Sequence, residues 1–139
     1  MKLHTYLNFG GNCAEAFRFY EKHLGGKIGM IMTFGEAPPG QAKFEPKWKD
    51  KVLHARMTLG ETELMGSDVE KFQPIRSVYL SLGVDSDAEA ERVYKALSDG
   101  GEIQMPLQET FFASRFGQCR DKFGTSWMVT HMKPAPVQA

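Results

Sequence analysis

The sequence has no long apolar run and no excess of charge of either sign. Its 17 Lys and Arg balance 17 Asp and Glu, and its mean hydropathy is −0.37. Without a basic surplus, the main electrostatic drive toward nucleic acid or anionic lipid is missing. Residues 1–6 contain no stretch suited to a signal peptide or a membrane span. We therefore expect a cytoplasmic protein with neither nucleic acid nor membrane as a partner.

Cysteine is scarce as well. The 139 residues contain two, Cys13 and Cys119, without the close spacing of a metal site. In a chain without an export signal they are expected to be reduced thiols rather than a disulfide. A hydrophobic content of 42% is typical of an ordinary globular core that needs no such cross-link.

Two segments carry the same helix pattern. Each begins with a capping box, Asn12 with Glu15 and Ser86 with Glu89, and each ends at a glycine pair suited to a left-handed C-terminal cap. Residues 14–20 align with 88–94, and five of those seven positions are identical pairs. This agreement favours an internal duplication. We predict a single domain over 1–132, made of modules at about 1–68 and 75–132, followed by a tail at 133–139.

Strand patterns surround each helix in the same order, one before it and three after it. We therefore predict an α+β fold of tandem β-α-β-β-β modules, whose curved mixed or antiparallel sheets form a cleft. Residues 35–50, which contain Pro38-Pro39-Gly40, are expected to form a long lid. The expected strands cover 2–9, 27–33, 52–59 and 62–66 in the first half, and 77–84, 102–107, 112–119 and 126–131 in the second.

Alternation along these strands separates a core face from a second face. The core set includes Leu3, Leu7, Phe9, Leu53, Ala55, Met57, Leu59, Val78, Leu80, Leu82, Trp127 and Val129. A solvated second face is common in antiparallel sheets, but the residues here are rather apolar and aromatic for one. They suit the lining of a ligand-binding cleft. The predicted lining consists of His4, Tyr6, His54, Arg56, Tyr79 and Met128.

Two motifs resemble a known superfamily. Residues 6–20 read YLNFGGNCAEAFRFY, and residues 106–117 read PLQETFFASRFG, followed by Asp121-Lys122-Phe123-Gly124 and Trp127. Residues 53–57 and 64–68 add a weaker match. Together they resemble the glyoxalase/bleomycin-resistance/dioxygenase proteins, the vicinal oxygen chelate superfamily, and most closely its PhnB-like branch. The resemblance implies paired β-α-β-β-β modules around a cleft, commonly in a homodimer, and a homodimer is expected here.

The resemblance also bears on a metal site. By position, His4 falls on the first-module histidine ligand of the metalloenzymes, and Glu63 falls near the first-module carboxylate. The second-module positions hold Tyr79 and Met128, or Ser77 and Trp127 in the other register, and none of these is a usual ligand for a divalent metal. The predicted metal set, His4 and Glu63, is thus incomplete. His54 is a candidate third ligand, and His4 as a hydrogen-bonded cleft residue is the alternative.

Three functional readings follow. The leading one is a small-molecule-binding protein of the PhnB-like type, with an unidentified ligand and no assigned catalytic residue. The alternative is a divalent-metal-dependent isomerase, lyase or dioxygenase using the same cleft, and the third is a structural dimer without a ligand. Although related sequences have been described as methyltransferases, no glycine-rich nucleotide-binding turn joins a strand to a helix. We therefore expect no methyltransferase role.

Overall fold

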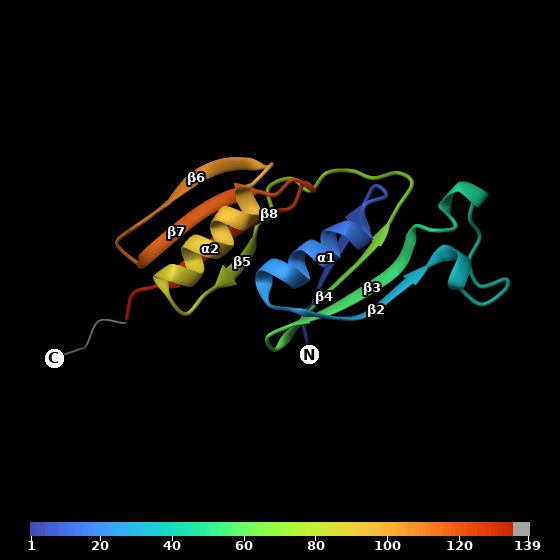
Figure 1. Cartoon of the computed structure of the whole chain (residues 1–139), viewed down its shortest axis with the longest axis horizontal. Coiled ribbons are helices and arrows are strands. Elements are labelled where there is room, and N and C mark those ends of the chain that lie inside the picture. The colour runs from blue at the N-terminus through green and yellow to red at the C-terminus, as the bar shows by residue number, and fades with distance from the viewer. Residues whose placement is uncertain (135–139) are drawn as a thin grey trace. The chain divides into compact units, whose positions relative to one another are not determined.

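The computed structural model describes residues 1–134 and divides the chain into two compact units, Met1–Gln73 and Pro74–Ala139. Each unit has the predicted order of one strand, one helix and three strands (Figure 1). The first unit contains β1 (Thr5–Phe9), α1 (Cys13–Leu24), β2 (Lys27–Thr33), β3 (Val52–Leu59) and β4 (Thr62–Asp68). The second contains β5 (Leu80–Gly83), α2 (Asp87–Ser98), β6 (Glu102–Gln108), β7 (Ala113–Arg120) and β8 (Ser126–Met132).

The two sheets have the same topology. The strand order is β1-β4-β3-β2 in one and β5-β8-β7-β6 in the other. In each sheet the first strand is parallel to the last strand of its unit, and the remaining pairs are antiparallel. The predicted α+β class with tandem β-α-β-β-β modules and mixed sheets is confirmed.

Each helix lies across one face of its own sheet (Figure 1). The helical periodicity in the sequence places Phe17 and Tyr20 of α1, and Val93 and Leu97 of α2, in the two cores, where all four are buried. Both helices bring an aromatic ring against a glycine of the sheet. A Cβ on Gly66 would lie 2.8 Å from Phe17 Cε1, and a Cβ on Gly117 would lie 2.8 Å from Tyr94 Cε2. Glycine at these positions therefore allows close packing of helix on sheet.

The start of α1 differs from the prediction. At α2 the expected cap is present, because the Ser86 hydroxyl accepts a hydrogen bond from Glu89 N–H at 3.0 Å. At α1 the Asn12 side chain makes no capping hydrogen bond. Asp68 Oδ1 accepts from Gly11 N–H at 2.9 Å and Cys13 N–H at 3.0 Å instead. Because β1 is parallel to β4 with Phe9 opposite Asp68, the end of β4 lies beside the start of α1.

Two strands are shorter than predicted. β1 starts at Thr5 rather than residue 2, and Leu3 is 94% exposed, so its assignment to the core was wrong. Thr5 pairs with Leu64, so Leu3 would lie opposite the first residue of β4, at the end of the sheet. β5 starts at Leu80 rather than 77, and Val78 is 50% exposed, which is a second error. Ser77 has a φ of 57°, which interrupts an extended strand. In addition, Leu80 pairs with Trp127 and β8 begins at Ser126, so Val78 has no residue of β8 opposite it.

The long excursion between β2 and β3 has structure of its own. It contains two short 3-10 helices, Phe34–Glu36 and Pro46–Trp48. The ring of Phe34 lies 5.8 Å from that of Phe44 and 6.1 Å from that of Trp48, and Gly35 N–H donates to Lys49 C=O at 2.9 Å. The segment expected to be a lid thus packs around a small aromatic cluster of its own.

Of the predicted tail, Lys133 N–H still donates to Phe112 C=O at 3.0 Å, and residues 135–139 lie outside the described part of the chain. No helix in residues 1–134 has the length and apolar character that crossing a bilayer requires.

Candidate functional site

The face of the first sheet that α1 does not cover carries most of the predicted site. Leu7, Ala55, Met57 and Leu64 are buried on the helix side, so their neighbours along the strands point the other way. Register places Tyr6 beside Met65, Met65 beside Arg56, and Glu63 beside Thr58. This second face is defined here by His4, Tyr6, His54, Arg56, Glu63 and Met65.

An aromatic pair lies on the second face. The rings of Tyr6 and His54 are stacked, with centroids 5.8 Å apart and planes at 28°. Tyr6 Oη and His54 Nδ1 are 3.3 Å apart, a hydrogen-bond contact whose direction depends on the imidazole tautomer. Tyr6 is 47% exposed, so about half of this large ring is open to solvent on the sheet face that α1 does not cover. The pair therefore offers an apolar platform with polar edges.

Next to this platform lies an ion pair. Arg56 Nε is 3.9 Å from Glu63 Oε2, and the two side chains are 50% and 35% exposed. An ion pair at this distance and exposure contributes about 0–1 kcal/mol to stability. Because Glu63 holds it so weakly, Arg56 can turn toward another acid group at little cost.

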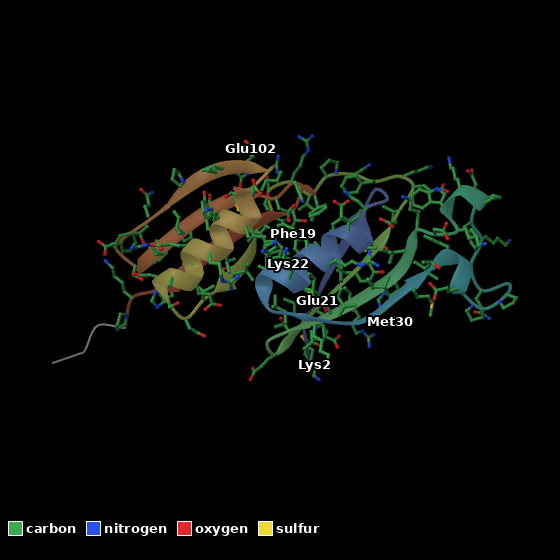
Figure 2. The ribbon with its side chains drawn as sticks, viewed as in Figure 1. Lys2, Phe19, Glu21, Lys22, Met30 and Glu102 are labelled. Carbon is green, nitrogen blue, oxygen red and sulfur yellow. The ribbon has the colours of Figure 1, made fainter. Side chains whose placement is uncertain are left out.

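His4 lies in a pocket at one end of the first sheet. The pocket has a volume of about 510 Å³. Glu63 lines it too, as does Lys2, which Figure 2 labels near the start of the chain. The Nδ1 atom of His4 is buried and has no hydrogen-bond partner, whereas buried polar atoms in folded proteins nearly always have one. The pocket is completed by Leu3, Thr58, Gly60, Glu61 and Thr62.

The donor set does not suit the divalent metal that the superfamily implies. His4 and Glu63 line the same pocket as predicted, but across residues 1–134 no three His, Cys, Asp or Glu side chains gather as a metal site would require. His54 Nδ1 is in contact with Tyr6 Oη. Since catalytic zinc sites take three protein ligands, no reaction step is derived through a metal.

Two predicted site residues belong to the second unit. Tyr79 precedes β5 and is 37% exposed. Met128 is partly buried in β8, opposite Ser81. Their membership of the same site as His4 stays a prediction of the sequence.

The sequence reasoning missed a polar cluster at the start of α2. Ser114 Oγ donates to Asp87 Oδ1 at 2.6 Å, and His131 Nδ1 lies 2.8 Å from each of these oxygens. Arg115 is 3.7 Å from Asp87 through Nη1 and donates to Glu91 through Nε at 3.2 Å. The serine and histidine sit on neighbouring strands, so only strand register could have linked them to Asp87. The cluster ties the helix to β7 and β8.

Although it contains serine, histidine and aspartate, this cluster is not a hydrolytic triad. In a triad the carboxylate holds Nδ1 of the histidine while the serine contacts Nε2. Here both oxygens contact Nδ1. Because the Ser114 proton goes to Asp87, Nδ1–H must be the donor in both contacts. The geometry assigns a structural role to Ser114.

This cluster makes stability depend on pH. Hydrogen bonds from Ser114 and then His131, with the nearby Arg115, hold the pKa of Asp87 below its ordinary value of 3.8. A depressed pKa stabilises the folded protein above pH 3.8, and the effect is lost as the pH falls through the lower folded value. We expect Asp87→Asn to lower the urea midpoint of unfolding at neutral pH, and to lower it by a smaller amount at about pH 3. The exposed Asp99→Asn serves as the control, and an equal Asp87→Asn shift at both pH values would contradict this explanation.

The two cysteines take no part in the site. Burial, and second the nearby Asp68, raises the pKa of Cys13 to about 12. Burial, and second Asp121, raises the pKa of Cys119 to about 11. Because the thiolate is the reactive form, both are expected to be inert core thiols.

The paired β-α-β-β-β units define a glyoxalase-like fold. At 17% identity, the glyoxylase/bleomycin resistance protein/dioxygenase domain from Frankia sp. EAN1pec shares this fold, with a TM-score of 0.66 over 96% of this chain and 98% of that one.

Closer matches identify the family. The model of the 3-demethylubiquinone-9 3-methyltransferase family matches residues 1–130. Protein YjdN of Escherichia coli (strain K12) is 32% identical over 99% of this chain and 100% of its own length. Protein PA1353 from Pseudomonas aeruginosa is 43% identical, with a TM-score of 0.87 over 96% and 99% of the two chains. The PhnB protein from Bacillus cereus is 30% identical, with a TM-score of 0.78 over 94% and 99%. The chain belongs to the family that this model describes, the PhnB-like family, and its fold is that of the glyoxalase/bleomycin-resistance/dioxygenase proteins.

Proposed function

We propose that this protein binds a small, partly apolar molecule with an acidic group against the second face of the first sheet. The observation that carries the proposal is the Tyr6–His54 pair beside Arg56. A flat apolar group gains by stacking on the exposed Tyr6 ring, and an acid group gains a charge-assisted hydrogen bond from Arg56. The loose contact of Arg56 with Glu63, at 3.9 Å, leaves the guanidinium available.

The proposal includes a homodimer in the cytoplasm. Support comes from the four sheet edges, β1, β2, β5 and β6, since unpaired edges are commonly covered in native assemblies. Two-fold dimers are also the commonest soluble oligomers.

Methyl transfer is not part of the proposal. Each sheet has a single parallel strand pair, unlike the mostly parallel sheet that carries a nucleotide-binding turn.

Light scattering first compares the mass of the native protein with the 15.6 kDa of one chain. The ¹⁵N-labelled protein is then titrated with two matched probes, 2-naphthoate and the neutral 2-naphthalenemethanol. We expect a dimer mass and saturable shifts at Tyr6, His54 and Arg56, with the acid binding more tightly. Arg56→Gln should weaken only naphthoate, by about 10-fold, whereas Tyr6→Ala should weaken both probes. Arg18→Gln, an exposed arginine on α1, should change neither. Saturable shifts confined to other regions, or equal affinity in Arg56→Gln, would contradict the proposal.

A metal-dependent isomerase, lyase or dioxygenase is the second candidate. The buried, unpartnered Nδ1 of His4 in the same pocket as Glu63 favours it, but a metal there would need a third ligand that residues 1–134 do not bring to this pocket. Elemental analysis of protein purified without a chelating tag separates the two candidates. Stoichiometric zinc, nickel, iron or manganese that His4→Ala removes would favour the enzyme. Naphthoate binding that is unchanged by a chelator would favour the metal-free binding protein.

A further inference from the structure

A separate cavity lies in the second unit, where β7 ends. Its volume is about 340 Å³, and it is lined by Pro74, Ile75, Arg76, Arg120 and Gly124. Arg120 is the last residue of β7, Gly124 lies in the turn to β8, and the other three residues precede β5. The cavity shares no residue with the second face of the first sheet. Two arginines therefore line one small cavity outside the proposed ligand site.

These two arginines have few acceptors. The nearest carboxylate oxygen to Arg120 is Glu102 Oε2, 3.7 Å from Nη1 and beyond hydrogen-bond distance. Figure 2 labels Glu102 at the start of β6. Arg120 Nε is buried and has no partner, and within residues 1–134 Arg76 has no ion pair. A guanidinium carries five N–H donors, so this cavity has a surplus of donors and of positive charge.

The backbone beside the cavity is held in unusual conformations. Ser77, directly after Arg76, has a φ of 57° and is the one residue other than glycine with a positive φ in residues 1–134. Such strain persists where the surrounding structure imposes it, and it is common at binding sites. A Cβ on Gly124 would meet no atom within 4 Å, which leaves open space on that side of the turn.

We propose that Arg76 and Arg120 bind a small oxyanion, a phosphate or carboxylate group, in this cavity. The planar fork of a guanidinium matches the paired oxygens of either group and forms strong charge-assisted hydrogen bonds with them. An anion would also offset the positive charge of the two arginines that line this cavity. The alternative is a pair of solvated arginines with Glu102 as a weak partner, and that arrangement binds no anion saturably.

The test titrates ¹⁵N-labelled full-length protein with inorganic phosphate, with succinate, and with chloride at matched ionic strength. We expect saturable shifts with phosphate or succinate at the Ile75, Arg76 and Gly124 amides and at the Nε–H signals of Arg76 and Arg120. Tighter binding of phosphate would indicate a phosphorylated ligand, and tighter binding of succinate a carboxylate ligand.

Variants tie the binding to the two side chains. Arg76→Gln and Arg120→Gln should each weaken it by about 10-fold or more. Arg120→Lys should also weaken it, because lysine keeps the charge and loses the fork. Arg18→Gln should bind as the wild type does. Arg76 is exposed and precedes the first strand of its unit, so its variant tests the site even if Arg120 variants fail to fold. Shifts no larger than those from chloride, or unchanged affinity in Arg76→Gln, would overturn the proposal.

Discussion

Replacing Asp68 by alanine should lower the free energy of unfolding by about 4 kcal/mol, since buried donors that lose their acceptor are left unsatisfied. Asp68 is 2% exposed. Its Oδ1 accepts from Gly11 N–H at 2.9 Å and Cys13 N–H at 3.0 Å, and its Oδ2 accepts from Val52 N–H at 2.9 Å. One carboxylate thus joins the end of β4 to the starts of α1 and β3. Urea unfolding followed by circular dichroism measures the loss.

Asn12→Ala is the matched control, because Asn12 occupies the N-cap position yet makes no side-chain cap. It should change the unfolding free energy by less than about 0.5 kcal/mol, the usual range for surface substitutions. Asp68→Asn should fall between the two, because an amide keeps one acceptor oxygen and adds an NH₂ group that has no acceptor there. A larger loss for Asn12→Ala than for Asp68→Ala would show that the capping box of the sequence is the true cap.

The difference between these residues shows what local sequence can predict. Ser86 and Glu89 are three positions apart, so a capping box was visible, and Ser86 does cap α2. The same spacing at Asn12 and Glu15 was misleading, because the cap comes from Asp68, which is distant in sequence. Only the parallel pairing of β1 with β4 brings it there. Local periodicity therefore predicted both helices. It could not predict that a residue at the end of β4 caps α1, because that contact depends on strand pairing.

Part of the candidate site could likewise be predicted from the local sequence pattern, and part could not. Strand alternation was enough to group Tyr6, His54 and Arg56, because a period of two does not depend on exact strand ends. It failed for Leu3 and Val78, because β1 and β5 begin after these residues and both side chains are exposed. The Arg76–Arg120 cavity could not be predicted from the sequence, because it forms where a turn, a strand end and an irregular segment meet, and these segments share no motif.

Gly66→Ala should destabilise the protein by about 3 kcal/mol, which is the upper part of the usual range for overpacking. An added Cβ would lie 2.8 Å from Leu7 C=O as well as 2.8 Å from Phe17 Cε1. The Leu7 oxygen belongs to the β1 backbone and cannot turn aside, so β1 must shift against β4, and the Phe17 ring or α1 must move as well. Gly29→Ala is the control on the same sheet, where the nearest atom to a new Cβ is Arg56 C=O at 3.9 Å. There the stiffer unfolded chain should leave stability equal or raise it by about 0.5 kcal/mol. Both variants are compared by urea unfolding, and equal midpoints would contradict close packing of α1 on Gly66.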